Sequence, residues 1–140
     1  MNTDELQLAQ YLKEQGYSLT KPRLTIFNAL SGHEAQTMAT LSKSCRGKID
    51  RASMYRTIAL FEKLGIVQRL QIGWKYKLEL TDRFSHHHHH MTCLRCGATT
   101  SLSEDTFLEQ RLHELAAAQN FQPTDHQIEI RGLCSSCQAG

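Results

Sequence analysis

The middle of the chain reads Ser85-His-His-His-His-His-Met-Thr-Cys-Leu-Arg-Cys-Gly97, five consecutive histidines that lead into a Cys-x-x-Cys motif. A second Cys-x-x-Cys motif occupies residues 134–137. Two such turns supply four thiolates, the donor set of a tetrahedral structural zinc site. Two disulfides or a redox-active pair are the alternatives, and the lack of a secretory feature at residues 1–5 favours reduced thiols. The zinc ligands that we expect are Cys93, Cys96, Cys134 and Cys137.

The histidine run lies inside the chain, so a terminal purification tag is a poor explanation for it. A solvated tract that binds metal loosely is a second alternative. If the run is partly a β-strand, His88 and His90 point to one side and His87 and His89 to the other. One short segment then serves two metal sites. Imidazole binds zinc, iron, nickel and copper, so the run by itself selects no metal.

Charge is distributed unevenly along the 140 residues. Residues 1–80 hold 12 Lys and Arg against 7 Asp and Glu, a net charge of +5, whereas residues 81–140 hold 4 against 7, a net charge of −3. A basic half beside an acidic, metal-rich half favours a nucleic-acid-binding unit joined to a sensor. No segment approaches the ~20 apolar residues of a transmembrane helix, and we expect a cytoplasmic protein.

Four amphipathic segments predict helices in the basic half. The first follows Thr3 as its N-cap, with Leu6, Ala9 and Leu12 on one face. The next two follow Thr20 and Thr37.

The fourth segment begins after Asp50, a good N-cap, and carries Met54, Ile58 and Phe61 as its apolar stripe. Its early polar residues fit a recognition helix that enters the major groove of DNA. A solvated helix face is the alternative. The residues that we expect to contact DNA from this helix are Arg51, Ser53, Tyr55, Arg56 and Thr57.

Residues 66–72 and 74–80 flank Gly73 and predict a two-stranded hairpin. In the second strand the residues alternate, so we expect one side to carry Trp74, Tyr76, Leu78 and Leu80 and the other side to carry Lys75, Lys77 and Glu79. Lys75 and Lys77 place positive charge where DNA phosphates can be bound. Three helices followed by a hairpin form a winged helix.

The second half predicts a small α/β unit. Strands are expected near the first Cys motif, at 98–102 and at 126–131, with Ile128 and Ile130 inward. A helix over about 104–119 follows Ser103, with Leu108, Leu112 and Leu115 as its seam. Such a unit buries little surface alone, so we expect a homodimer that presents two winged helices to a two-fold DNA site. The expected fold is α+β, with a winged helix over 1–81, a hinge over 82–85 and a dimerisation and metal-binding domain over 86–140.

Several motifs together resemble the ferric uptake regulator family of metal-sensing bacterial repressors. They are Thr20-Lys-Pro-Arg23, Ala52-Ser-Met-Tyr-Arg-Thr-Ile58, Gly65-Ile-Val67, the histidine run into Cys93-x-x-Cys96-Gly97, and Gly132-Leu-Cys-x-x-Cys137. The resemblance covers nearly the whole chain. It implies DNA contacts from Tyr55 and Arg56, with Arg23 at the start of the second helix as a further candidate.

The resemblance also implies two further metal sites. A regulatory site between the domains maps onto His33, Glu79, His88 and His90. An additional site in the dimerisation domain maps onto His87, His89, Glu109 and His126. The other histidines, His86 and His113, receive no role and are expected to be solvated.

The chain departs from the family pattern at the regulatory site. Ser101 stands where the family usually has an acidic residue, which leaves four ligands and favours tetrahedral zinc over higher-coordinate iron or manganese. Zn²⁺ and Fe²⁺ are both candidates for the regulatory metal, and Mn²⁺ is a weaker one because three of the four ligands are nitrogen. The longer linker lets Asp82 compete with Glu79 for the carboxylate role, and His33 lies about two residues earlier than the usual histidine. His89 stands where many members have Asp.

The function we expect is a metal-dependent transcriptional repressor of iron or zinc homeostasis genes that binds an AT-rich inverted repeat. A histidine-rich metal buffer or chaperone is an alternative, as is a peroxide-sensing regulator of the same family. We expect no enzyme, because a zinc hydrolase would need a motif such as His-Glu-x-x-His, which is absent from the sequence. We also expect no membrane partner and no small-molecule substrate.

Overall fold

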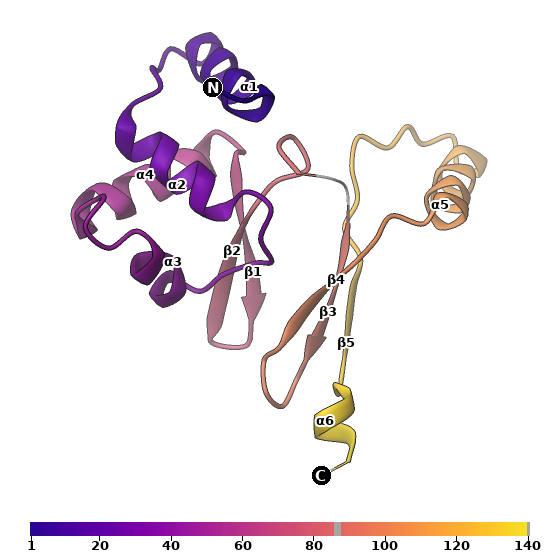
Figure 1. The fold of residues 1–140 in the computed structure, drawn as a ribbon. Helices are drawn as coiled ribbons and strands as arrows, with labels where there is room; N and C mark the ends of the chain where they lie inside the picture. Colours follow the sequence, from indigo (N-terminus) through magenta and orange to yellow (C-terminus); the bar gives the residue numbers. More distant parts are fainter. Residues whose placement is uncertain (86–87, 140) are drawn as a thin grey trace. The chain divides into compact units, whose positions relative to one another are not determined.

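A computed structural model describes residues 1–85 and 88–139. The chain divides into two compact units, Met1–Ser85 and His86–Gly140. Figure 1 shows the first unit as helices and a hairpin and the second as a sheet with helix α5. In the described parts no helix combines the length and the apolar character that crossing a membrane requires.

The first unit begins with four helices, each with a side chain that caps its first turn. The helices are α1 (Thr3–Glu14), α2 (Lys21–Leu30), α3 (Met38–Ser44) and α4 (Arg51–Lys63). Thr20, Thr37 and Asp50 are the N-caps of α2, α3 and α4, as predicted. The prediction for α1 was wrong by one residue, because Asn2 is the N-cap and forms a capping box with Glu5.

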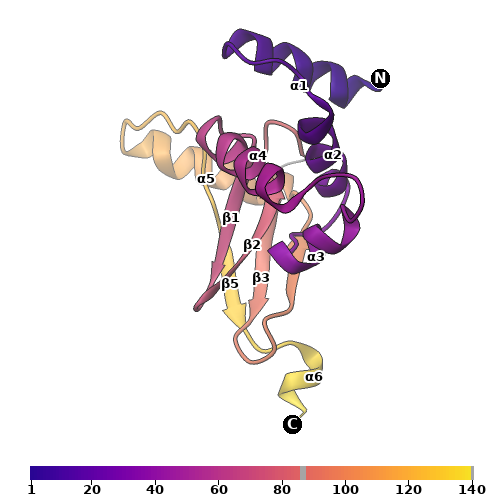
Figure 2. The same cartoon turned by 90° about the vertical axis from the view of Figure 1, so that its left-hand side faces the viewer.

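The hairpin pairs β1 (Val67–Ile72) with β2 (Lys75–Leu80), antiparallel, in a register that places Val67 opposite Leu80. Both views place α4 beside this hairpin (Figures 1 and 2). Gly73 and Trp74 form the connecting turn, and the φ of Gly73 is +59°, which a residue without a Cβ adopts readily. The prediction that Trp74 belongs to the second strand was wrong: it lies in the turn before β2 and is fully exposed.

One apolar core joins the helices to the hairpin. It includes Phe27 of α2, Phe61 of α4 and Leu78 of β2, each with no exposed surface. In α1 the buried positions are Leu8 and Leu12, whereas Leu6, expected on the inner face, is half-exposed. The helical period places Leu8 and Leu12 one turn apart, so they define the buried stripe.

The segment after β2 stays attached to the first unit. The ring of Phe84 meets those of Tyr11 and Phe27 edge to face, with centroids 5.9 and 5.5 Å apart. The Arg83 guanidinium lies 4.3 Å from the centroid of the Tyr11 ring. Aromatic and cation–π contacts of this kind stabilise packing by about 1 kcal/mol each. They tie the residues up to Phe84 to the helices of this unit.

The second unit contains a mixed sheet with the strand order β4-β3-β5. Its strands are β3 (His89–Cys93), β4 (Thr99–Leu102) and β5 (Glu129–Gly132). β3 pairs with β4 antiparallel and with β5 parallel. The parallel connection from β4 to β5 contains helix α5 (Thr106–Ala118), and a short helix α6 (Ser135–Gln138), which was not predicted, follows β5.

Helix α5 starts and packs differently from the prediction. Its N-cap is Asp105, whereas Ser103 had been predicted. The Asp105 carboxylate accepts hydrogen bonds from the backbone N–H groups of Phe107 and Leu108. No residue of α5 is buried, and Leu108 and Leu115 are exposed. Ile130, predicted to face inward from β5, is also exposed. The single chain therefore leaves the apolar seam of this unit uncovered.

Candidate metal centres and DNA-binding surface

The parallel pairing of β3 with β5 brings the two Cys-x-x-Cys motifs together. Cys93 ends β3 opposite Gly132 of β5, and the backbone N–H of Leu94 donates a hydrogen bond to the Gly132 carbonyl at 2.8 Å. Gly97 closes the first turn at φ +75°. Cys134 and Cys137 lie at the start of α6 and within it. Both motifs therefore lie at the same end of the sheet.

The four cysteines have the spacing of a tetrahedral thiolate site. Their Sγ atoms all lie within 4.8 Å of one another, and Cys96 Sγ lies 3.8 Å from Cys134 Sγ. Zinc–sulfur bonds of about 2.3 Å in a tetrahedron place neighbouring sulfur atoms about 3.8 Å apart. A disulfide requires about 2.05 Å, and all five cysteines are free thiols. The geometry fits a zinc ion and does not fit the disulfide alternative.

The surroundings give two of these thiols, Cys93 and Cys137, very different pKa values. Hydrogen bonds from the backbone at Cys134 and Cys96 lower the pKa of Cys93 to about 5. The neighbouring cysteines, Cys134 first, raise the pKa of Cys137 to about 12. A thiolate at Cys93 next to a protonated Cys137 is the arrangement expected of a cluster that shares protons until a cation neutralises it.

A second group of donors joins the sheet to α5. Nε2 of His89 lies 2.6 Å from Oε1 of Glu109, and Nε2 of His126 lies 2.5 Å from Oε2 of the same carboxylate. The three ligand atoms lie within 4.8 Å of one another. His89 is 2% exposed and the Glu109 side chain 12%. Two imidazoles and one carboxylate form a donor set that zinc or iron accepts.

Neighbouring side chains of β3 point to opposite faces of the sheet, as predicted, so His89 lies on a different side from His88 and His90. His88 and His90 lie together with ring centroids 4.7 Å apart, while His89 meets Glu109 and His126. His90 lies opposite Ser101 of β4, the position at which the usual acidic residue is missing. His87, expected at the additional site, lies outside the described residues.

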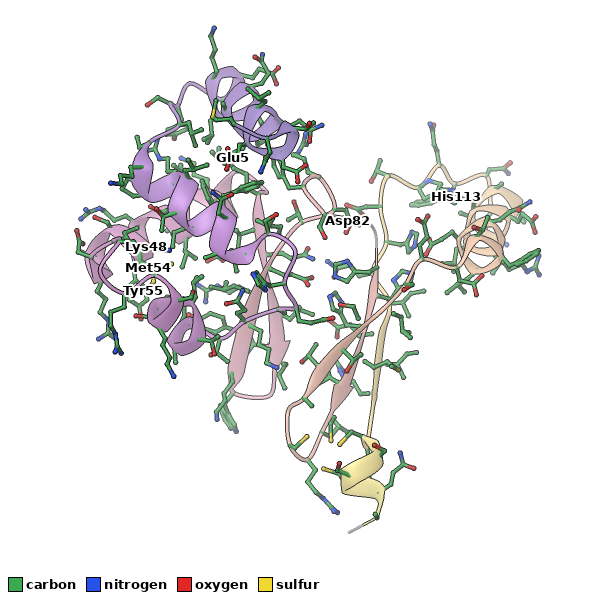
Figure 3. All side chains as sticks on the ribbon, in the orientation of Figure 1. Glu5, Lys48, Met54, Tyr55, Asp82 and His113 are labelled. Carbon is green, nitrogen blue, oxygen red and sulfur yellow. The ribbon has the colours of Figure 1, made fainter. Side chains whose placement is uncertain are left out.

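The regulatory candidates of the first unit lie along β2. Glu79 is in β2, where its Oε1 accepts a hydrogen bond from the Gln68 amide at 2.7 Å. His33 is in the loop after α2, and this loop is joined to β2 by the bridge between Gln36 and Leu78. Leu78 precedes Glu79, so the loop runs beside the strand that carries Glu79. Asp82, labelled in Figure 3, lies in the exposed turn after β2.

Helix α4 presents an inner and an outer face. Met54 is buried, whereas the adjacent Tyr55 is 45% exposed (Figure 3). Arg56 donates a hydrogen bond from Nη2 to Ser53 Oγ at 3.1 Å, and the Arg51 guanidinium lies 5.8 Å from the centroid of the Tyr55 ring. An exposed, basic and aromatic first half of a helix is suited to contact DNA.

Asp50 fixes the start of that helix. Its Oδ1 accepts a hydrogen bond from the Ser53 backbone N–H at 2.7 Å, and this bond is the main reason that the pKa of Asp50 is lowered. The carboxylate therefore stays ionised as an N-cap at neutral pH.

The remaining DNA candidates differ in accessibility. Thr57 is 7% exposed and packs with the core side of α4. The hairpin of β1 and β2 is the wing of the winged helix. Its Lys75 is exposed and its Lys77 half-buried, and the fully exposed Trp74 lies next to Lys75 in the turn. Arg23 donates a hydrogen bond to the Ser18 carbonyl at 2.6 Å and lies near the Tyr17 ring.

Comparison with known proteins agrees with this architecture. The model of the family described as "Ferric uptake regulator family" matches residues 14–131. The ferric uptake regulation protein of Vibrio cholerae serotype O1 is 38% identical over 133 residues, which is 91% of this chain and 87% of that protein.

The similar solved structures include two ferric uptake regulators. The crystal structure of the Vibrio cholerae ferric uptake regulator has a TM-score of 0.68 at 34% identity, covering 89% of this chain and 98% of the other. The ferric uptake regulator of Pseudomonas aeruginosa with manganese has a TM-score of 0.74 at 25% identity, covering 89% and 95%. By sequence and by fold, the chain belongs to the ferric uptake regulator family.

Proposed function

We propose that the protein is a homodimeric repressor whose binding to operator DNA depends on a regulatory metal ion. The observation that carries this proposal is the placement of donors on β3. In β3 and the residue before it, the rings of His88 and His90 lie close together, and His89 contacts Glu109. Cys93, at the end of β3, belongs to the group of four cysteines. A chain that combines these groups with the exposed face of α4 has the parts of a metal-controlled DNA-binding protein.

In this proposal the regulatory ligands come from both units. His33 and Glu79 belong to the first unit, and His88 and His90 to the second. An ion held by all four would favour one arrangement of the DNA-binding units over others, since a ligand shifts an equilibrium by its differential affinity. Couplings of this type are typically ~1–3 kcal/mol. Bound DNA would in turn increase the affinity for the metal by the same factor.

The chemistry of the four proposed ligands limits which metal ion is suited to the regulatory site. Three imidazoles and one carboxylate suit Zn²⁺ or Fe²⁺ better than Mn²⁺, which prefers oxygen ligands. Ser101, opposite His90, brings a hydroxyl in place of a fifth, carboxylate ligand. A small set of ligands is the usual condition for tetrahedral zinc.

The other metal sites would have structural roles. The four cysteines would hold zinc and fix α6 to the end of β3. His89, Glu109 and His126 would hold a second ion between β3 and α5. Exposed Leu108, Leu115 and Ile130 would be covered by a second copy of the chain, because a monomer rarely leaves so many large apolar side chains of one small unit in water.

DNA recognition would use the outer face of α4 and the wing. Tyr55 and Arg56, with Arg51 and Ser53, would meet base edges and phosphates in the major groove. Lys75 and Lys77 would bind phosphates beside it. Two such units related by a two-fold axis would recognise an inverted repeat.

The test is fluorescence anisotropy with an AT-rich inverted-repeat duplex at fixed salt, because phosphate contacts make affinity steeply salt-dependent. Zinc-loaded protein would be titrated with buffered Zn²⁺, anaerobic Fe²⁺ or Mn²⁺ in turn, and operators would first be enriched from genomic fragments. Tight binding that one metal induces and a chelator reverses supports the repressor and identifies the metal. Metal binding without any metal-dependent DNA binding would support the buffer alternative, and loss of DNA binding after peroxide treatment of the Fe²⁺ form would support the peroxide sensor.

A further inference from the structure

His113 was expected to be solvated, yet it lies close to the group formed by His89, Glu109 and His126. It follows Glu109 by four residues in α5, so the two side chains leave the helix on the same face, one turn apart. Its ring lies edge-on to that of His126, with centroids 6.4 Å apart and planes at 85°. Figure 3 labels His113 on α5.

The ring spacing of His89 and His126 matches that of imidazoles that share an ion, and His113 lies slightly further away. Two imidazoles bound at about 2.0–2.1 Å to one tetrahedral zinc have ring centroids about 5 Å apart. The rings of His89 and His126 are 5.3 Å apart, close to that value. The His113 ring is about 1 Å further from His126, a gap that rotation of an exposed side chain can close.

We propose that His113 is a further ligand of the ion held by His89, Glu109 and His126, so that the described residues supply three imidazoles and one carboxylate to it. Imidazole and carboxylate donors are the ligands of many zinc sites. This inference rests on the three-residue site proposed above and is independent of DNA binding.

The proposed set gives α5 two anchors. Glu109 and His113 would both leave the same face of a helix that buries none of its residues within the single chain. His89 belongs to β3, and His126 lies three residues before β5. The ion would therefore fasten α5 to the sheet through side chains where apolar packing does not.

The experiment uses Co²⁺ as a spectroscopic probe of the full-length protein. The background variant carries His88→Ala and His90→Ala, so that the regulatory pair does not contribute, and the four-cysteine site keeps its zinc. Into it are introduced His113→Ala, His113→Gln, His126→Ala and, as a matched control on the exposed side of α5, Gln110→Ala. Zinc content and circular dichroism verify that each variant is folded.

We expect the background and the Gln110→Ala control to show the intense visible absorption of tetrahedral Co²⁺. Both His113 variants should lose that intensity and bind Co²⁺ at least about tenfold more weakly, since even changes behind a ligand cost about 10–100-fold. His126→Ala should abolish the band. Unchanged spectra and affinity in both His113 variants, with the band lost in His126→Ala, would overturn the role of His113 and leave the three-residue site standing. A band unaffected by His126→Ala would overturn that site and the inference with it.

Discussion

Glu109 Oε1 lies 2.6 Å from Nε2 of His89, so a side chain of α5 meets a buried side chain of β3 directly. The other oxygen of the same carboxylate meets His126. In the described part of the chain α5 buries none of its own residues, and these contacts connect it to the sheet. The carboxylate is therefore expected to matter both for metal binding and for the position of the helix.

Replacing Glu109 with alanine should remove the additional metal site and loosen α5. The two imidazoles lose the group that joins them, and an unpaired buried imidazole costs about 1–3 kcal/mol. Hydrogen exchange should become faster at the amides of α5, and metal analysis should find one ion fewer per chain than in the native protein. Glu114→Ala is the control, because Glu114 is exposed on the same helix and pairs with Arg111 at 3.3 Å. Equal metal content in Glu109→Ala and native protein would contradict the assignment.

Replacing both His88 and His90 with alanine should abolish metal-dependent DNA binding and leave the structural zinc in place. His88 and His90 are two of the four proposed regulatory ligands, whereas the structural zinc site consists of the four cysteines and contains neither histidine. Anisotropy with the selected operator, at fixed salt, measures the first effect, and zinc analysis after dialysis against a weak chelator measures the second. A variant that still required metal to bind DNA would show that the switch lies elsewhere.

Replacing Ser101 with glutamate should increase the affinity for Mn²⁺ relative to Zn²⁺. Ser101 lies opposite His90 in the β3–β4 pair, so a carboxylate there adds an oxygen ligand beside the imidazole. Oxygen donors and higher coordination numbers favour manganese. Competition between the two metals, followed by calorimetry, measures the ratio. Thr100→Glu is the control, because neighbouring residues of a strand point to opposite faces; an equal shift in both variants would argue against a specific ligand.

Zinc binding at the four cysteines should release a proton from Cys137 at pH 7 but none from Cys93. The pKa of Cys93 is lowered from 9.0 to about 5, so its contribution to folding is full above pH 9 and is lost as the pH falls towards 5. The pKa of Cys137 is raised from 9.0 to about 12, so its contribution is full below pH 9 and is lost as the pH rises towards 12. At neutral pH the first is a thiolate and the second a thiol.

Calorimetry of zinc binding in two buffers of different ionisation enthalpy counts the released protons. Cys137→Ser should lower the count by about one relative to the native protein, while Cys93→Ser should not lower it. An equal reduction in the number of released protons in both variants would contradict the proposal that Cys137 carries a proton at pH 7 and Cys93 does not.

The wing should contact DNA, and its tryptophan offers a direct signal. Trp74 is the single tryptophan of the chain and is fully exposed in the turn between β1 and β2. Operator binding should therefore change its fluorescence emission. Lys75→Ala should weaken binding and reduce the slope of log K against log salt by about 0.9, the value for one phosphate contact. Lys13→Ala, near the end of α1, is the control; equal slopes in both variants would remove the wing from the interface.

Local chemistry made much of the first unit predictable. Thr20, Thr37 and Asp50 cap helices because the side chain of each accepts a hydrogen bond from the backbone N–H only three residues later. Trp74 was misplaced because its alternation with Tyr76 and Leu78 continues into a turn, where the strand period no longer applies. Leu108 and Leu115 were predicted to be buried from their spacing alone, and spacing does not say whether the cover is this chain or another copy.

The ligand types, the two cysteine turns and the alternation of the histidines could be predicted from the amino-acid order, because each depends on residues within a few positions of one another. The proximity of His113 to His126 and the pairing of Ser101 with His90 became visible only in the folded chain. Those relationships depend on the register of β3 with β4 and on where the segment between α5 and β5 places His126 relative to α5. Both are set by packing between segments distant in sequence, which no local pattern encodes.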